Sequence, residues 1–191
     1  MGPGACGVAG ASPASDADLV DVRAVVPDAV VDLRYATADN FVGRQLYPAG
    51  ARCLVHESLA PGLAAAAAVL RPQLLVFWDC YRPHEVQVEM FDAVPNPAWV
   101  ARPGRYARSH TAGRSVDVTI AGADMGTGFD DFSPRSLAYA TDGVSPAAQA
   151  NRARLREAMA VGGLAVYDGE WWHFDGPGAA VDRPILAVPL V

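Results

Sequence analysis

The chain has 191 residues, enough for one domain with a substantial hydrophobic core. Hydrophobic residues make up 51% and charged residues 19%, a globular composition that excludes a largely disordered chain. The formal net charge of -6 argues against nucleic-acid binding, which favours a basic surface, and no apolar run of roughly eighteen residues is present to span a membrane.

The N-terminal segment is rich in Gly, Ala, Ser and Pro. We expect residues 1–17 to form a flexible tail before a single domain over residues 18–191. The tail contains no basic segment followed by a long apolar one, so the sequence as it stands predicts a cytoplasmic protein. Cys6 followed by such a linker also fits the mature start of a lipoprotein whose leader is missing. That alternative places the protein in the periplasm or cell envelope.

Local patterns predict alternating extended segments and helices in the first half of the domain. Val26 to Thr37 indicates an extended segment that enters a turn-rich loop, and the good helix formers of His56 to Arg71 predict a helix. The apolar stretch Leu74 to Cys80 predicts a buried strand that ends at Arg82-Pro83. His84 to Val94 predicts a further helix.

The second half of the domain continues this alternation. Arg114 to Ile120 alternates apolar and polar residues and predicts a strand. Ser145 to Gly163 predicts a helix with Ser145 as its N-cap. Leu164 to Asp168 and Trp171 to Asp175 predict a hairpin about the Asp168-Gly169 pair. These elements predict an α+β domain, with helices packed on a mainly antiparallel sheet.

Two of the four histidines lie in unusual local contexts. His110 precedes a turn containing Gly113, and a glycine turn lets the loop fold back toward Asp117 on the next strand. Asp117 is flanked by Val116 and Val118, where a buried carboxylate is costly unless it is paired or bound to a metal. The alternative is that Asp117 faces solvent on a half-exposed strand.

His173 would complete a set of three ligands with His110 and Asp117. Two histidines and one aspartate leave a fourth position for water, the arrangement of a catalytic zinc. The proton of that water needs a carboxylate acceptor, for which Glu170 is the candidate. Residues three apart point to opposite faces of a regular strand, so Glu170 must lie at the hairpin end or on a bulge. Trp171, between them in sequence, is expected to pack in the core with its neighbour Trp172.

Arg82 follows a predicted buried strand, where a guanidinium beside a metal would stabilise an oxyanion. From spacing alone, a surface salt bridge with Glu85 explains it equally well. His56 and His84 are expected to be surface or capping residues. A serine hydrolase is unsupported, because no G-x-S-x-G motif is present.

The three cysteines are too few for a four-cysteine zinc site. Cys53 precedes the predicted Ala-rich helix, and Cys80 ends the strand that follows it. If helix and strand pack antiparallel, the two residues meet and a Cys53–Cys80 disulfide is feasible. Such a bond would indicate an oxidising compartment, whereas free thiols would fit a reducing one.

Six motifs, in this order, resemble the D-alanyl-D-alanine dipeptidases, including the vancomycin-resistance type. The resemblance runs from about Val31 to Asp175, and it implies a zinc peptidase fold shared with D-Ala-D-Ala carboxypeptidases and the hedgehog signalling domain. The motifs are DLRYATADNFVGRQLY (32–47), WDCYRP (78–83), SHTAGRSVDVT (109–119), MGTGFDDF (125–132), NRARLREAM (151–159) and EWWHF (170–174).

The resemblance also implies roles for the residues singled out above. His110, Asp117 and His173 would be the ligands of one Zn²⁺ ion per chain. Glu170 would be the general base, and Arg82 would stabilise the tetrahedral intermediate.

Three further residues match the substrate pocket of that family. Tyr35 and Asp130 match positions that recognise the ammonium end of the substrate, and Ser109 matches a pocket residue of less certain role. The implied partner is a small molecule, the D-alanyl-D-alanine dipeptide, and the implied setting is cell-wall precursor turnover or vancomycin resistance.

Two rival functions stay open from the sequence. A D,D-carboxypeptidase would act on longer muropeptides, and Asp130 favours the dipeptidase over it. A non-catalytic zinc-binding domain would need neither Glu170 nor Arg82.

Overall fold

A five-stranded sheet lies at the centre of the computed structural model, which describes residues 18–191. The tail expected for residues 1–17 lies outside the described residues. The strand order is β2-β4-β5-β7-β6, with β2 parallel to β4 and every other pair antiparallel. The strands are β2 (Val30–Val31), β4 (Leu75–Asp79), β5 (Ser115–Ile120), β6 (Ala165–Val166) and β7 (His173–Asp175). The α+β class with a mainly antiparallel sheet is therefore confirmed.

Strand β5 is the middle strand, and all six of its residues are buried. Its apolar residues Val116, Val118 and Ile120 pack in the core with the fully buried Phe77 of β4. The opposite face of β5 is covered as well, so Asp117 does not face solvent. A strand buried on both faces explains why a polar residue on it needs a specific partner.

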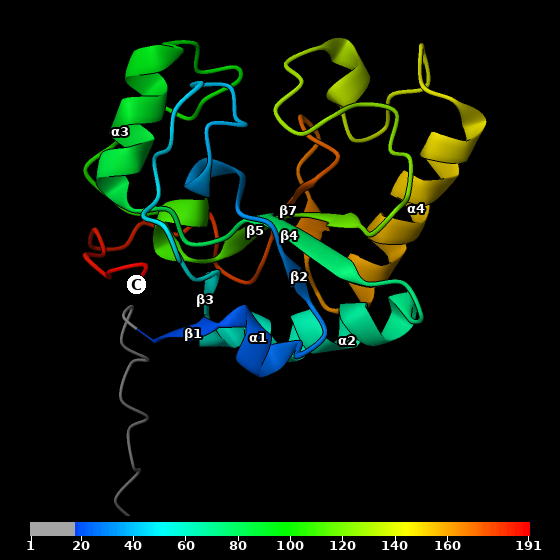
Figure 1. Ribbon diagram of the computed structural model, residues 1–191, viewed down its shortest axis with the longest axis horizontal. Coiled ribbons are helices and arrows are strands. Elements are labelled where there is room, and N and C mark those ends of the chain that lie inside the picture. The colour runs from blue at the N-terminus through cyan, green and yellow to red at the C-terminus, as the bar shows by residue number, and fades with distance from the viewer. Residues whose placement is uncertain (1–17) are drawn as a thin grey trace, which may run out of the picture.

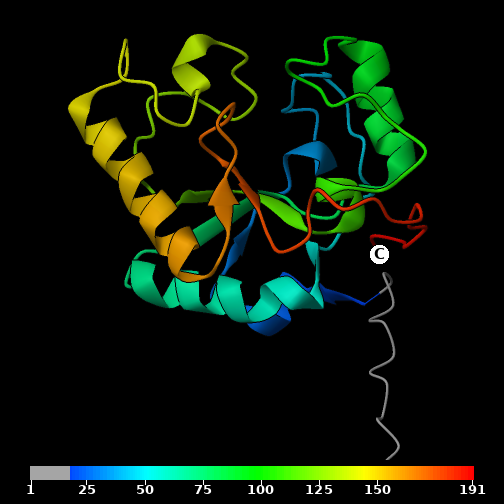
Figure 2. The same cartoon turned by 180° about the vertical axis from the view of Figure 1, so that it is seen from behind.

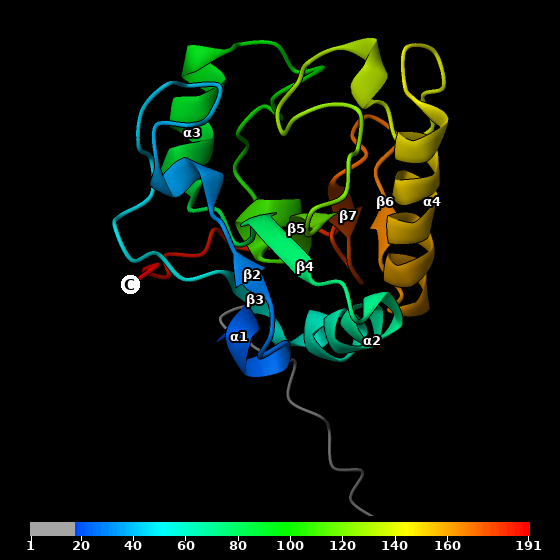
Figure 3. The ribbon, with the colours of Figure 1, turned by 45° about the vertical axis from the view of Figure 1, so that its right-hand side comes forward.

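Four α-helices surround this sheet in the described part of the chain. In Figures 1 and 2, α3 and α4 lie at opposite sides of the sheet, while α1 and α2 lie together beneath it. Figure 3 shows the loops that follow α3 and β5 at the end of the molecule away from α2. The helices are α1 (Val22–Val25), α2 (Ala60–Leu70), α3 (His84–Ala93) and α4 (Pro146–Val161).

Helix α4 and the hairpin after it agree closely with the sequence. The Ser145 side chain caps α4 by accepting a hydrogen bond from the Ala148 amide at 3.1 Å. The helix ends beside α2, where a Cβ atom on Gly62 would lie 2.1 Å from the Gly162 carbonyl oxygen. Only glycine allows the two backbones to approach this closely.

Two N-terminal segments differ from the sequence-based expectation. The extended segment expected over Val26 to Thr37 keeps only the two residues of β2, and a 3-10 turn (η1, Arg34–Ala36) follows. The helix expected from His56 begins at Ala60 instead, after a 3-10 turn (η2, Glu57–Leu59). His56 belongs to an unexpected strand, β3 (Leu54–His56), which pairs antiparallel with β1 (Leu19–Asp21) in a second, two-stranded sheet.

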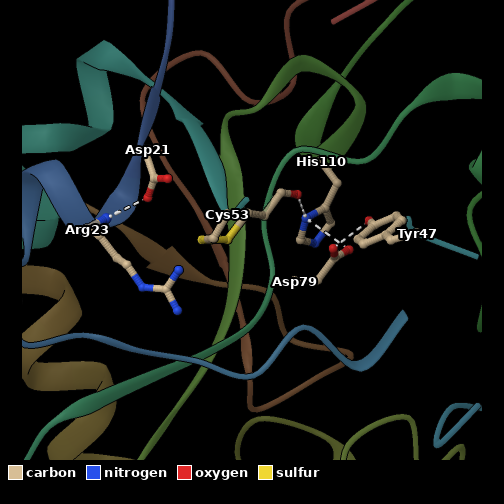
Figure 4. Close-up of a disulfide and its surroundings, with 7 residues drawn as sticks. Asp21, Arg23, Tyr47, Cys53, Asp79 and His110 are labelled. Atoms are coloured by element: carbon tan, nitrogen blue, oxygen red, sulfur yellow. Dashed lines mark hydrogen bonds and ion pairs between the residues drawn. A yellow bond between two sulfur atoms is a disulfide. The ribbon is translucent and has the colours of Figure 1, made fainter. Parts of the chain in front are cut away.

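The feasible disulfide is present. Cys53, just before β3, is bonded to Cys80, just after β4, with the two Cα atoms 5.2 Å apart (Figure 4). Both cysteines are buried. The bond joins the small sheet to the end of β4 from which the Arg82 segment continues.

Within residues 18–191, no helix combines the length and the apolar character needed to cross a lipid bilayer.

We predict that protein purified without reductant has one titratable thiol per chain after denaturation. The sequence contains three cysteines, and the structure uses Cys53 and Cys80 in a disulfide. Thiol titration in denaturant measures this, with a reduced sample as the control in which all three cysteines react. Three thiols in the unreduced sample would contradict the bond.

Candidate active site

Three side chains of the site stand side by side across three strands. The strand register places Asp79 of β4 opposite Asp117 of β5, and Asp117 opposite His173 of β7. The register of β4 shifts between Phe77 and Asp79, so a β-bulge directly precedes Asp79. Asp79 and Asp117 are 0% and 3% exposed, and each buried carboxylate therefore requires a cationic or hydrogen-bonding partner.

His110 reaches this row from a short 3-10 turn, η3 (Ser109–Ala112), directly before β5. Gly113 ends the turn in the left-handed conformation with φ 65°, and its amide donates to the His110 carbonyl. A Cβ atom at position 113 would also lie 2.5 Å from Cδ2 of Leu19. The glycine turn expected from the sequence thus brings His110 back over β5.

The ligand atoms of the three predicted metal-binding residues converge on one point. His110 Nε2 lies 3.2 Å from Asp117 Oδ1 and 3.1 Å from His173 Nδ1, and His173 Nδ1 lies 3.1 Å from Asp117 Oδ1. In the described part of the chain, these residues form a group with the geometry to hold a metal ion. Nitrogen and oxygen ligands about 2.0–2.2 Å from a tetrahedral zinc lie at separations close to these.

The outer hydrogen bonds of the two histidines turn lone pairs toward that point. His110 Nδ1 donates to the backbone carbonyl of Cys80 at 2.8 Å (Figure 4), which leaves Nε2 without a proton in the neutral ring. His173 Nε2 donates to Asp175 Oδ1 at 3.0 Å, which in the neutral ring leaves Nδ1 without a proton. Three acceptor atoms then face one another at hydrogen-bond distance, an arrangement that a cation would stabilise. The residues present therefore fit a zinc ion.

The charges in this cluster are strongly coupled. Burial acts to raise the pKa of Asp117, but His110 and His173 outweigh it and hold that pKa far below its ordinary value. Burial acts to lower the pKa of His173, but hydrogen bonds to Asp117 and Asp175 outweigh it and raise the pKa to about 10. Without a metal, the cluster thus retains a proton that zinc must displace.

Glu170 lies in the turn of the β6–β7 hairpin, outside the regular ladder as its spacing requires. Its amide donates to the Tyr167 carbonyl at 3.1 Å, and one carboxylate oxygen lies 3.9 Å from His173 Nδ1. Desolvation raises the pKa of Glu170 to about 6, with a further contribution from the negative charge of Asp117, while nearby cationic groups oppose the shift. A carboxylate with this pKa is suited to accepting a proton near neutral pH.

Arg82 forms no surface salt bridge with Glu85 but is bound to the buried Asp79. Its Nε and Nη2 atoms donate to Asp79 Oδ2 at 3.0 and 2.7 Å, and Nη2 lies 3.9 Å from Asp117 Oδ2. Burial acts to lower the pKa of Arg82, but the Asp79 carboxylate outweighs it and raises that pKa well above its ordinary value. The guanidinium is therefore a permanent cation beside the ligand cluster.

Tyr35 and Asp130, predicted to bind the ammonium group, are brought together from distant segments. The Tyr35 hydroxyl donates to Asp130 Oδ2 at 2.8 Å. Asp130 has φ 55°, in the left-handed region that non-glycine residues rarely adopt. Desolvation raises the pKa of Asp130 well above its ordinary value, an effect that the Tyr35 hydrogen bond partly offsets.

Ser109 also has a left-handed backbone, with φ 47°. Its hydroxyl donates to Ser115 Oγ at 2.9 Å, and Ser115 in turn donates to Asp175 Oδ1. Ser109 is therefore linked, through Ser115 and Asp175, to the ring of His173.

A cleft of about 630 Å³ joins these residues. A second cavity of about 670 Å³ shares Phe41 and Asp130 with this cleft, and none of the three predicted zinc ligands lines it. The predicted residues that line the cleft are Tyr35, Arg82, Ser109, His110, Asp130, Glu170 and His173, while Asp117 lies buried beneath it.

Some residues of the site were not singled out from the sequence. Asp79 lies within the motif of residues 78–83 and ends β4, while Asp175 directly follows the motif of residues 170–174 and ends β7, so a carboxylate at the end of a short apolar stretch was a usable signal. Gln87 gave no such signal, because it looks like any polar residue on a helix. His56 is buried rather than exposed, and its side chain caps η2 by accepting from the Ser58 amide. Trp171 and its neighbour Trp172 pack in the core as expected.

Comparisons with known proteins identify relatives that share one name. A relative from Escherichia coli (strain K12), named D-alanyl-D-alanine dipeptidase, is 38% identical over 177 residues, which cover 89% of this chain and 90% of the relative. A protein of the same name from Enterococcus faecium is 31% identical over 176 residues, covering 75% and 83%.

A solved structure with a weaker similarity is an alanine mutant of the vancomycin-resistance D,D-pentapeptidase VanY in complex with Zn(II). It has a TM-score of 0.44 and 18% identity, over 66% of this chain and 75% of that one. Nothing about this chain follows from a similarity at that level.

The family model described as D-ala-D-ala dipeptidase matches residues 15–190, almost the whole chain. With this match and a relative 38% identical over nearly its full length, the chain belongs to the D-Ala-D-Ala dipeptidase family of peptidases.

Proposed function

We propose that this protein is a zinc-dependent dipeptidase that hydrolyses D-alanyl-D-alanine. The observation that carries the proposal is the convergence of three ligand atoms, from His110, Asp117 and His173, at a cleft that Glu170 and Arg82 also line. The three residues would hold Zn²⁺, which when bound polarises a carbonyl group and lowers the pKa of water to about 7.

Glu170 would act as the general base. It lines the cleft beside His173, and its pKa of about 6 leaves it ionised at neutral pH. It would accept a proton from the attacking water and deliver that proton to the leaving amine.

Arg82 would stabilise the negative charge that develops on the scissile carbonyl oxygen. Its side chain is positioned before substrate arrives, because Asp79 binds two of its nitrogen atoms. A donor held in place in this way adds little reorganisation cost during the reaction.

Asp130 and Tyr35 would bind the free ammonium group of the dipeptide. Ser109, which also lines the cleft, would contact another part of the dipeptide. A non-catalytic zinc domain has no use for a general base, an oriented guanidinium and a carboxylate together in one cleft. Their presence supports an enzyme.

The disulfide indicates in which compartment this activity would take place. A Cys53–Cys80 bond persists in an oxidising environment, and this favours the cell envelope over the cytoplasm. An enzyme there would act on dipeptide released from the wall, rather than deplete the cytoplasmic precursor.

We predict that His173→Ala removes zinc. Elemental analysis of the dialysed protein should find one zinc per chain in the wild type and little in the variant, because two of three ligands bind a divalent ion weakly. His84→Ala is the matched control, since His84 lines the same cleft but belongs to no ligand group in the described part of the chain. Full zinc content in His173→Ala would remove His173 from the site.

We predict that Glu170→Gln retains zinc and loses roughly a hundredfold or more in kcat, the usual scale for a general base. Asp168→Asn, in the same hairpin turn but exposed, should leave kcat unchanged. In the wild type, kcat/KM should decrease as the pH is lowered through about 6 or below, because Glu170 must be ionised to accept a proton. The positive charge of bound zinc lowers the pKa of Glu170 further, which moves this decrease to lower pH. An acid limb above pH 7, or near-normal turnover of Glu170→Gln, would assign the proton transfer to another group.

We predict that Asp130 makes the enzyme selective for free dipeptides. A substrate ammonium would lower the raised pKa of Asp130 and form a charge-assisted hydrogen bond with its carboxylate, whereas a longer or acetylated substrate presents a neutral amide there. N-acetyl-D-Ala-D-Ala should be a poor substrate for the wild type and for Asp131→Asn, while Asp130→Asn should lose the preference and keep its zinc. Equal rates on D-Ala-D-Ala and on a pentapeptide ending in it would favour a D,D-carboxypeptidase.

A further inference from the structure

Gln87 is a buried amide of α3 that lines the cleft and is 5% exposed. Its Oε1 atom accepts from Arg82 Nη1 at 2.7 Å, and its Nε2 atom donates to the Ala101 carbonyl at 2.7 Å. A guanidinium can only donate and a carbonyl can only accept, so both contacts are satisfied in one orientation of the amide alone. Both polar atoms of the Gln87 side chain therefore have hydrogen-bond partners within the protein.

The hydrogen bonds of Arg82 show what Gln87 adds. A guanidinium has five N–H donors, of which Asp79 accepts two and Gln87 a third. The Asp79 contacts hold one edge of the plane, formed by Nε and Nη2, and Gln87 holds Nη1 outside that edge. Contacts on separate edges restrict rotation of the group more than contacts on one edge.

Two N–H donors remain, one on Nη1 and one on Nη2, and the Nη2 donor is the one near the ligand cluster. Nη2, with one donor not used by Asp79, lies 3.9 Å from Asp117 Oδ2. The backbone supports the same placement, because the Arg82 amide donates to the His110 carbonyl at 3.1 Å. Arg82 is therefore oriented by a metal-ligand segment, by a buried carboxylate and by Gln87.

The second contact of Gln87 connects Arg82 to the far wall of the cleft. Residues 97–106 line that wall, and Ala101 lies in the middle of them. The backbone of this segment is linked to the guanidinium through a single amide side chain, which is itself shielded from water.

We propose that Gln87 is a positioning residue for Arg82, holding the guanidinium so that its free N–H groups face the carbonyl of the substrate. This inference rests on the proposed function, because it takes Arg82 as the group that stabilises the oxyanion. It assigns to Gln87 no contact with the reacting atoms.

The first test is the near-isosteric Gln87→Met variant of the zinc-loaded enzyme, assayed on D-Ala-D-Ala. We expect kcat to fall by about tenfold to a hundredfold, the effect of a small misplacement of a catalytic group, with little change in KM. Gln149→Met is the matched control, because Gln149 on α4 also donates to backbone carbonyls but lies away from the cleft. A loss confined to KM would overturn the proposal.

A double-mutant cycle separates positioning from a merely structural role. If Gln87 acts through Arg82, Gln87→Met should cost nothing further in an Arg82→Ala enzyme. Independent, multiplying losses would show that Gln87 acts by another route, and thermal melting of each variant would reveal a loss of folding.

Gln87→Glu is the second variant and keeps the proposal testable if Gln87→Met fails to fold. Glutamate retains the acceptor for Arg82 but replaces the donor to Ala101, so we expect it to retain most of the wild-type kcat. If Gln87→Glu is as slow as Arg82→Ala, the hydrogen bond from Gln87 to the Ala101 carbonyl is the one that matters, and the proposal is overturned.

The two proposals fail in different ways. A zinc-loaded wild type with no activity on D-Ala-D-Ala would refute the proposed function. An active wild type whose rate is unchanged by Gln87→Met would refute only the role of Gln87.

Discussion

The constraint on which the rest of the structure depends is the burial of two carboxylates on neighbouring strands. Asp79 and Asp117 face each other across β4 and β5 in the middle of a sheet covered on both faces. Like charges this close in a low dielectric environment repel strongly, and each is costly to bury alone. Asp79 is compensated by Arg82, and Asp117 by His110 and His173, so the partners that these two buried anions require are themselves residues of the site.

The surrounding elements can be understood as the means of bringing those partners into place. The turn ended by Gly113 returns His110 over β5, and the hairpin after α4 places His173 beside Asp117. The bulge in β4 and the helix start after Arg82 direct the guanidinium back toward the strand it has just left. Stability and chemistry are therefore difficult to separate, since the same charges that must be neutralised for folding also form the site.

The sequence was most informative where a local pattern determines the outcome. The alternation around β5, the cap at Ser145 and the displacement of Glu170 from its strand each depend on a few adjacent residues, and each agrees with the structure. The strands β1 and β3 were missed because each has three residues and exists only by pairing with the other. The contacts of Gln87 were missed for a related reason, since they join residues that no spacing rule connects.

Cys80 contributes to the structure through two different atoms, its sulfur in the disulfide and its carbonyl oxygen to His110 Nδ1. The carbonyl is present whatever the side chain, so alanine scanning and sequence comparison are both blind to the group that sets the protonation of a candidate metal ligand. Position 80 is then free to vary in sequence as far as the metal site is concerned. The hydrogen bond between the Cys80 carbonyl and His110 can be tested directly by a change to the main chain. An ester in place of the peptide bond that follows residue 80 would weaken this carbonyl as an acceptor.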